Sequence, residues 1–338
     1  MNEIGSEFHQ IATGNGTGVY LPPDVVDDTF SFCGRTAIET VLKNESEIRK
    51  ALLPSYCCES MIQPFVRAGI DVAFYGVNYN KELRIDLQIE DDVDCIVWCN
   101  YFGFTVDMPD LSDFIERGGI VIEDITHSFF SRKQYHCQSH YLVASLRKWE
   151  PILCGGYCAS FKSELHHKPA IAPPIAFLNQ KRNAMQSKTV YLEGAGFVPK
   201  EVFLKAFSDS NTWLSQNYSE LAIDEESVAF LKTVNLARER EVRRGNAQIL
   251  YEGLEGSNYR FLFKQEDVDC PLFFPIVIGN SERNSIRKRL IDHHIYCPVH
   301  WPKPDGCESN LYDTELSLIC DQRYDKNDMK RVVSVLCD

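Results

Sequence analysis

The sequence predicts an α/β protein with a large, mostly parallel-sheet domain and a smaller C-terminal α/β domain. Short apolar runs alternate with helical patterns over roughly the first 160 residues, which is typical of parallel strands joined by helices. From Lys200 the pattern becomes mainly helical, and a second, shorter alternation follows towards the C-terminus. We expect the large domain to span residues 1–234, with an N-terminal arm over about 1–30, and the small domain to span 235–338.

The elements of the large domain follow from the period of their apolar residues. A helix begins at Gly34-Arg35, because the apolar residues between 37 and 42 lie on one face. Elsewhere short apolar runs predict strands, and amphipathic stretches closed by glycine predict helices. The expected strands are 51–54, 71–75, 94–98, 120–123, 141–146 and 157–161, and the expected helices are 59–68 and 111–117.

The C-terminal part begins with the longest helix that the sequence predicts, from about Glu225 to Leu254. The domain boundary is expected inside or beside this helix. The elements expected after it are a strand over 272–278, a helix over 281–293, a strand over 295–299 and a helix over 327–337.

Composition excludes several classes of partner. The chain has 35 Lys and Arg against 48 Asp and Glu, and the net charge of −13 would repel a nucleic acid or an anionic membrane. No apolar run approaches the roughly 20 residues needed to cross a bilayer, and residues 1–10 have no apolar core of a secretory signal. The 13 cysteines, several of them inside apolar runs, predict reduced thiols in a cytoplasmic protein.

The candidates for chemistry are the residues just after the expected strands, because ligands bind at the carboxyl ends of parallel strands. Asp124 ends one strand, and His127 follows three residues later. Lys148 comes 24 residues after Asp124, and the pair Gly155-Gly156 begins seven residues after Lys148. Upstream, Gly34-Arg35-Thr36 opens a helix.

This set of residues fits a site for pyridoxal 5'-phosphate (PLP). Such a site needs a lysine that binds the cofactor covalently and an acid that keeps the ring nitrogen protonated, so that the ring can accept electrons. Lys148 and Asp124 can fill these roles, and His127 can lie beside the ring hydroxyl. The helix entry Gly34-Arg35-Thr36 can bind the phosphate through its amides.

Together these residues resemble the DegT/DnrJ group of sugar aminotransferases, PLP enzymes of the aspartate aminotransferase fold. Asp124, His127, and Lys148 with Gly155-Gly156 match the family's site at the same spacing. The resemblance extends over most of the chain, through the stretches 34–38, 53–57, 68–72, 101–103, 274–277, 295, 300–302, 318, 321–324 and 328–329. It implies the fold and assigns Lys148 as the catalytic, cofactor-binding lysine, with Asp124 as its catalytic partner.

Three departures from the family pattern bear on the site. The family's phosphate-binding serine lies five residues before the lysine, where this chain has Val143, and Ser145 is the candidate to replace it. Cys58 stands where many members stack an aromatic ring on the cofactor, so Tyr101 or Phe102 is the candidate to cover the ring. The family's Gly-Tyr-Asn-x-Arg segment, which reaches the neighbouring subunit's site, is not recognisable, and residues 179–183 stand in that region.

The resemblance implies an enzyme that transfers an amino group from glutamate to an oxo-sugar, with a nucleotide-linked sugar expected, in glycan or other sugar biosynthesis. It also implies a homodimer. Two alternatives stay open, namely a PLP enzyme of this fold that dehydrates or uses a non-sugar substrate, and a non-catalytic regulatory protein.

Two further groups of residues bear on ligands. An anionic substrate would need basic residues, and the candidates are Arg35, Arg147, Lys181 and Arg182. The two adjacent histidine pairs, 166–167 and 293–294, have no further ligands nearby in sequence, so we expect no metal site.

Overall fold

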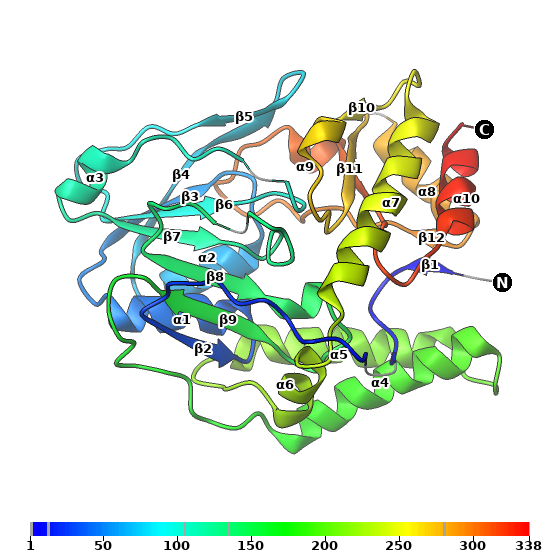
Figure 1. The fold of residues 1–338 in the computed structure, drawn as a ribbon, viewed down its shortest axis with the longest axis horizontal. Helices are drawn as coiled ribbons and strands as arrows, with labels where there is room; N and C mark the ends of the chain where they lie inside the picture. Colours follow the sequence, from blue (N-terminus) through cyan, green and yellow to red (C-terminus); the bar gives the residue numbers. More distant parts are fainter. Residues whose placement is uncertain (1–2, 12–13, 105, 134, 280–281, 338) are drawn as a thin grey trace. The chain divides into compact units, whose positions relative to one another are not determined.

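The computed structural model describes residues 3–11, 14–104, 106–133, 135–279 and 282–337 (Figure 1). The chain forms two compact units, each assembled from separate stretches of sequence. Unit 1 contains Glu7–Ser46 and Tyr141–Leu236, and unit 2 contains Glu3–Ser6, Glu47–His140 and Ala237–Asp338. The domain boundary expected between residues 234 and 235 stays a prediction.

Unit 1 contains three antiparallel strands in the order β2 (Asp27–Ser31), β9 (Gly156–Ser160) and β8 (Tyr141–Ser145). The helix α1 (Gly34–Asn44) packs against β8 and β9 through its buried face. Gly156 lies in register between Ser31 of β2 and Ser145 of β8, so the two strand ends and the start of α1 meet at one place. The strands expected over 141–146 and 157–161 are therefore present within one residue at each end.

The other helices of unit 1 are α4 (Ile175–Glu193), α5 (Lys200–Asn217) and α6 (Glu225–Leu231). Figure 1 shows α4 and α5 running side by side as a helical hairpin. Gly194 ends α4 in the left-handed conformation (φ 65°), which a glycine adopts without strain. The apolar core between the two helices consists of Leu153, Ala184, Met185, Phe203 and Phe207.

The single helix expected over 225–254 is wrong, because the chain breaks between α6 and α7 (Leu236–Leu254). The N-terminal arm occupies the break. The amide of Gly16 donates to the carbonyl of Thr233 over 2.9 Å, and a Cβ on Gly16 would lie only 2.0 Å from the carbonyl oxygen of Val234. The carbonyl groups of Thr233 and Val234 accept hydrogen bonds from amides of the arm and not from the amides of a further helical turn. The helix α6 therefore ends before them.

Unit 2 contains the parallel strands in the order β7, β6, β3, β4, with β5 added antiparallel at the edge. Apart from the unexpected β5, these strands and two helices confirm the elements expected from the sequence. Their bounds are β3 Lys50–Pro54, α2 Glu59–Arg67, β4 Asp71–Tyr79, β5 Leu83–Asp86, β6 Cys95–Cys99, α3 Ser112–Glu116 and β7 Ile120–Asp124.

The C-terminal part of unit 2 is a three-stranded antiparallel sheet with α7 and two later helices packed around an apolar core. The sheet order is β10 (Arg260–Phe261), β11 (Phe274–Val277), β13 (Glu315–Leu318). The remaining elements are β1 (Ile4–Gly5), which pairs in parallel with β12 (Ile295–Tyr296), the short helices η2 (Gln265–Asp267) and α9 (Leu311–Thr314), and the helices α8 (Arg283–Asp292) and α10 (Lys326–Cys337). The predicted start of α8 at Ser281 lies outside the described residues.

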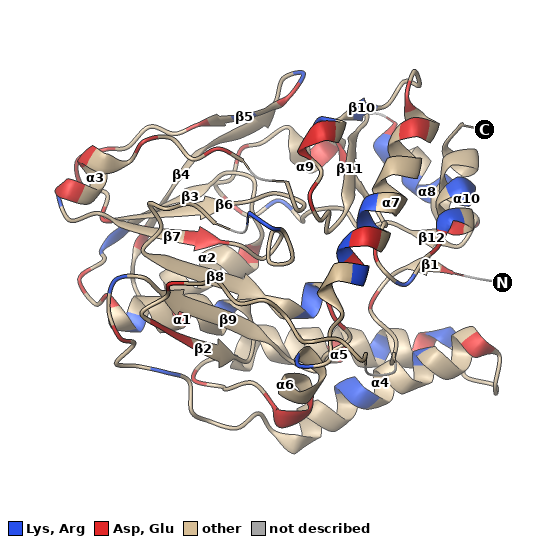
Figure 2. Ribbon diagram, viewed as in Figure 1, with Lys and Arg blue, Asp and Glu red and all other residues tan. Residues whose placement is uncertain are grey.

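The strands of the two units differ in the charged residues that they carry. Figure 2 shows β8 and β9 without a charged residue, whereas β7 ends in Glu123 and Asp124.

Within the described stretches no helix combines the length and apolar character needed to cross a membrane. All 13 cysteines are free thiols, and most are buried. The predicted fold class, α/β with a large mostly parallel sheet, is confirmed.

Candidate functional site

The end of β8 positions the predicted lysine in unit 1. Ser145 is the last residue of β8 and directly precedes η1 (Leu146–Lys148), a single turn of 3-10 helix. Lys148 ends this turn, three residues after Ser145. Both residues are half-buried. A hydroxyl and an amine therefore follow one another closely at the carboxyl end of a strand.

The start of α1 lies against this strand end. A Cβ added to Gly34 would lie 3.2 Å from the Cβ of Ser145, which is a tight contact between the two segments. The first helical hydrogen bond runs from the Ala37 amide to the Cys33 carbonyl (3.0 Å), so the amides of residues 34–36 precede the hydrogen-bonded ladder. Cys33 makes no side-chain capping bond, and the first turn carries no acidic residue. The helix end is thus suited to an anion beside Ser145.

The hydroxyl of Thr36 makes a packing contact, although a hydroxyl at a helix entry suggests a phosphate ligand. Its side chain is buried, and its Oγ1 donates to the carbonyl of Tyr218 over 2.9 Å. The hydroxyl therefore fastens α1 to the end of α5, which leaves the backbone amide of Thr36 for the phosphate role expected of Gly34-Arg35-Thr36.

The spacing between Lys148 and Gly155-Gly156 has a packing cause. The amide of Gly155 donates to Phe32 (2.7 Å), and its carbonyl accepts from Leu146 (3.0 Å). A Cβ on Gly156 would lie 2.3 Å from the carbonyl oxygen of Cys33, the residue before α1. The glycine pair therefore lets the lysine turn, β9 and the start of α1 pack backbone against backbone.

In unit 2, Asp124 ends β7 beside Cys99, which ends the parallel strand β6. The Asp124 carboxylate accepts the amide hydrogen of Thr126 over 2.8 Å, which fixes its side chain in a turn directly after the strand. Asp124 is half-buried. The side chain thus lies at the carboxyl edge of the parallel sheet, where the sequence places the ring-binding acid.

His127 is buried in the same turn and has a defined tautomer. Its Nδ1 accepts the amide hydrogen of Phe102 over 3.0 Å, so the neutral ring carries its proton on Nε2 and can donate from there. The indole of Trp301 lies nearly parallel to the imidazole, with the ring centroids 5.8 Å apart and an interplanar angle of 28°.

Tyr101 is a core residue of unit 2. It is fully buried, and its hydroxyl donates to the carbonyl of Tyr56 over 2.7 Å. Phe102 is also fully buried, and its backbone adopts φ 59° in the turn before Gly103. The proposed stacking role of either ring stays a prediction, and the hydrogen bond of Tyr101 favours a packing role. Cys58 precedes α2 and contacts the Ser60 hydroxyl (2.8 Å).

Two residues beside His127 were not singled out for the site by the sequence. They are His300, whose ring centroid lies 5.9 Å from that of His127, and Trp301. Both follow directly after the expected strand 295–299, so the rule that identified Asp124 could have identified them. His300 contacts the Ser317 hydroxyl through Nδ1 (2.7 Å), and Ser317 in turn donates to buried Glu315.

Unit 1 therefore brings together Gly34, Ser145 and Lys148, and unit 2 brings together Asp124 and His127. These residue types fit PLP. Unit 1 offers an amine, a hydroxyl and a helix end without an acidic residue, and unit 2 offers a carboxylate and an imidazole donor. Within the described ranges, no three His, Cys, Asp or Glu side chains are close enough to hold a metal ion.

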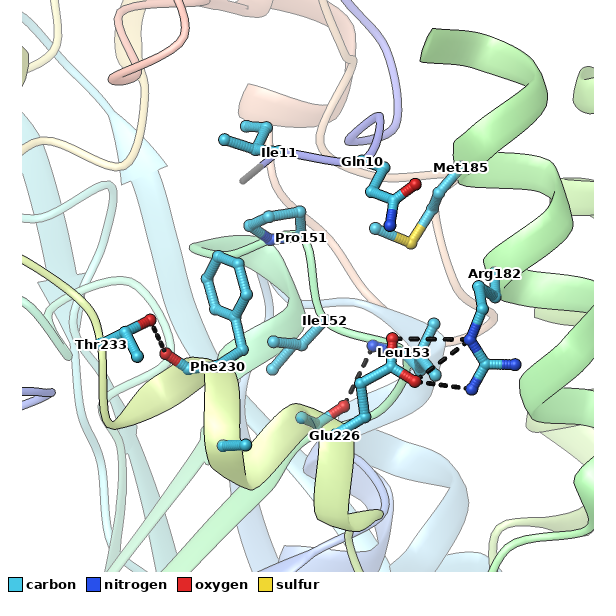
Figure 3. Close-up of a pocket in the computed structure, with 12 residues that line it drawn as sticks. Gln10, Ile11, Pro151, Ile152, Leu153, Arg182, Met185, Glu226, Phe230 and Thr233 are labelled. Atoms are coloured by element: carbon cyan, nitrogen blue, oxygen red, sulfur yellow. Dashed lines mark hydrogen bonds and ion pairs between the residues drawn. The ribbon is translucent and has the colours of Figure 1, made fainter. Parts of the chain in front are cut away.

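A cavity of about 280 Å³ lies in unit 1 beneath the loop that follows Lys148 (Figure 3). Its walls are mostly apolar and come from the N-terminal arm, α4, α6 and the loop 151–153. Arg182 lies at its edge and is paired with Glu226, with 2.6 Å between Nη2 and Oε2. This candidate basic residue is thus already neutralised.

Comparison with known proteins was made at the level of sequence and of fold. No family model matches the sequence, and no curated protein matches it. The fold matches that of Helicobacter pylori PseC, an aminotransferase involved in pseudoaminic acid biosynthesis, with a TM-score of 0.68 over 99% of this chain and 98% of that chain, at 14% identity. The chain has the fold of the DegT/DnrJ sugar aminotransferases.

Two further solved structures agree. The sugar aminotransferase CalS13 from Micromonospora echinospora gives a TM-score of 0.63 at 13% identity, over 97% of this chain and 98% of that chain. A DegT/DnrJ/EryC1/StrS aminotransferase from Brucella abortus gives 0.60 at 14% identity, over 94% of this chain and 91% of that chain. The DegT/DnrJ fold expected from Asp124, Lys148 and the glycine pair is thereby confirmed.

Proposed function

We propose that this chain is a PLP-dependent aminotransferase that transfers an amino group from glutamate to a nucleotide-linked oxo-sugar. One observation carries the proposal. The start of α1 lies in close contact with Ser145, since a Cβ on Gly34 would lie 3.2 Å from the Cβ of Ser145, and Ser145 comes directly before the turn η1 that ends at Lys148. A phosphate held at that helix end would place the rest of a bound cofactor within reach of the lysine. The DegT/DnrJ fold supports the sugar substrate.

PLP, when bound, supplies an electrophilic carbon and a ring that accepts electrons. Lys148 would hold the cofactor covalently and, once its amine is free, would move a proton as a general base and acid. Asp124 would keep the proton on the ring nitrogen through its carboxylate. His127 would donate from Nε2 to the ring oxygen, and the Ser145 hydroxyl would bind the phosphate with the α1 amides.

We further propose that the chain works as a cytoplasmic homodimer. Large apolar side chains are exposed on and beside α4 and α5, and Phe197 in the connection between these helices is 95% exposed. Burial in a dimer would remove this apolar surface from water. Free thiols throughout the chain support a reducing compartment.

The proposal is tested by adding PLP to the purified protein and recording the visible absorption spectrum before and after borohydride reduction. Peptide mapping should then place the label on Lys148. Lys148→Ala should lose both the absorption and the label, whereas Lys162→Ala, which removes a surface lysine paired with Glu45 in the same unit, should keep both. A label on another lysine would contradict the assignment.

Glutamate added to the PLP-loaded protein should convert the cofactor to its amine form, and oxo-sugars should reverse this change. Conversion that only non-sugar oxo compounds reverse would replace the sugar assignment. PLP binding without conversion by any amino donor would favour the regulatory alternative.

A further inference from the structure

Trp301 lies at the carboxyl edge of the parallel sheet in unit 2 and is not used by the proposed chemistry. Its indole contacts Tyr56, which follows β3, with the ring centroids 5.0 Å apart, and His127, which follows β7, with the centroids 5.8 Å apart. In the sheet β6 lies between β3 and β7, so one indole bridges the ends of strands that are not adjacent. Ligands of parallel sheets bind at this edge.

The indole of Trp301 is turned towards a flat ligand beside His127. Its plane makes an angle of only 28° with that of the imidazole. The Nε2–H bond of His127 lies in the imidazole plane, so a flat ring whose oxygen accepts from Nε2 has its edge towards His127. When such a ring is held near the imidazole plane, Trp301 faces it and does not meet it edge-on. Trp301 is half-buried, so part of the indole is accessible to a ligand.

The residue before Trp301 is fastened at both its backbone and its side chain. The carbonyl of His300 accepts a hydrogen bond from the Tyr56 hydroxyl over 2.6 Å, and its ring Nδ1 lies 2.7 Å from the Ser317 hydroxyl. His300 is buried, and Ser317 in turn donates to buried Glu315. Trp301 therefore follows a residue with a fixed place, and a ring that is held before the ligand arrives stacks on it at a smaller cost in entropy.

The residues that the sequence offers for covering the cofactor ring are engaged elsewhere. Cys58 has no ring, and its thiol contacts the Ser60 hydroxyl over 2.8 Å. Tyr101 and Phe102 are both 0% exposed, and the Tyr101 hydroxyl donates to the carbonyl of Tyr56. A ring that the protein encloses on all sides offers no face to a ligand unless the surrounding core rearranges.

We propose that Trp301 stacks on the pyridine ring of bound PLP and takes the place of the aromatic residue that position 58 lacks. The indole supplies a large flat apolar surface, and it is the aromatic side chain that attracts a cation most strongly. The ring nitrogen that Asp124 would keep protonated gives the pyridine ring such a positive charge. This inference rests on the proposed function, because it assigns a residue to the cofactor of that reaction.

The test measures the binding of pyridoxamine 5'-phosphate by calorimetry, because this amine form of the cofactor binds without a covalent bond to Lys148 and without turnover. Trp301→Leu removes the aromatic ring but keeps an apolar side chain, and should weaken binding about tenfold. Trp301→Phe keeps a smaller ring and should weaken binding less than about threefold. Phe261→Leu, which removes a half-buried ring stacked on Tyr251 in the same unit, is the matched control and should change the affinity less than about twofold.

Tryptophan fluorescence gives a second readout, which decides the matter if Trp301→Leu does not fold. PLP quenches the emission of a tryptophan that it contacts, so its addition should lower the emission of the wild type by more than that of Trp301→Phe. Trp149, which follows Lys148 in the sequence, is present in both proteins and contributes equally to the two decreases. Equal decreases in the two proteins would overturn the proposal.

The outcomes separate this inference from the proposed function. A wild-type protein that binds neither PLP nor pyridoxamine 5'-phosphate would overturn both. A wild-type protein that binds pyridoxamine 5'-phosphate with the same affinity as Trp301→Leu would overturn the inference alone. Quenching of the Trp301 emission by an oxo-sugar and not by PLP would overturn it as well, because the indole would then belong to the substrate.

Discussion

Glu315 makes the stability of unit 2 depend on pH. The carboxyl group lies on β13, is 0% exposed and accepts a hydrogen bond from the Ser317 hydroxyl. The Tyr56 hydroxyl lies 3.3 Å away from Oε2. Burial raises the pKa of Glu315 from 4.5 to about 8, although the Ser317 and Tyr56 hydroxyls lower it in part. The folded protein therefore keeps this group protonated at pH 7.

The sign of the effect follows from the number of bound protons. Between pH 4.5 and about pH 8 the unfolded chain has lost the proton of Glu315 and the folded chain keeps it, so stability falls as pH rises. The difference between 8 and 4.5, at about 1.4 kcal/mol per pH unit, amounts to about 5 kcal/mol over the whole range. From about pH 5.5 to 8 the share of this one group is about 3 kcal/mol.

Glu315→Gln keeps the shape and removes the titration. Urea unfolding is followed by tryptophan fluorescence, to which Trp301 beside Tyr56 contributes. Between about pH 5.5 and 8 the variant should lose about 3 kcal/mol less stability than the wild type loses. Glu226→Gln, which removes a half-exposed carboxylate, should leave the pH dependence of the wild type unchanged. Parallel curves for Glu315→Gln and the wild type would refute the reasoning.

Two predictions concern packing and capping in unit 1. Gly156→Ala should lower the melting temperature steeply or prevent folding, because its Cβ would lie 2.3 Å from the carbonyl oxygen of Cys33. Gly245→Ala is the matched control, because no atom outside its own helix lies within 4 Å of the new Cβ. This variant should gain about 1 kcal/mol of stability from helix propensity. Equal melting temperatures of the two variants would contradict the packing argument. Asp224→Ala should cost about 1–2 kcal/mol in urea unfolding, because the carboxylate caps α6 at the Ser227 amide (2.9 Å), and an unchanged midpoint would show that the cap contributes nothing.

The sequence predicted the strands β3, β4, β6 and β7 of unit 2 well because their apolar runs are continuous and their ends carry clear signals. Cys95–Cys99 is buried at every position, and Gly118-Gly119 closes the helix before β7. The strand β2 was missed because Asp27 and Asp28 have low strand propensity. Partners distant in sequence compensate for this, since Lys168 pairs with Asp27 and the Tyr157 hydroxyl donates to Asp28.

The helix α4 was missed for a different reason. Its buried positions include Lys181 and Lys188, so charge falls on the face where a helical pattern shows apolar residues. The N-terminal arm makes these buried charges tolerable, since Lys181 pairs with Glu7 and Lys188 donates to the Glu7 carbonyl. No local pattern contains that information, because Glu7 lies more than 170 residues away. The false prediction of one helix over 225–254 has the same cause, a contact with the arm.

The residues around Val143 and Ser145 bear on the predicted phosphate site. Val143 stands where the family has its serine, but it is 1% exposed and pairs with Cys158 inside the sheet of unit 1. A hydroxyl at that position would be buried in the strand. Ser145 lies two residues further along the same face, at the point where β8 ends beside Gly34. Ser145 comes directly before the turn η1, which ends at Lys148, so we predict that its hydroxyl takes the role of a serine five residues before the lysine.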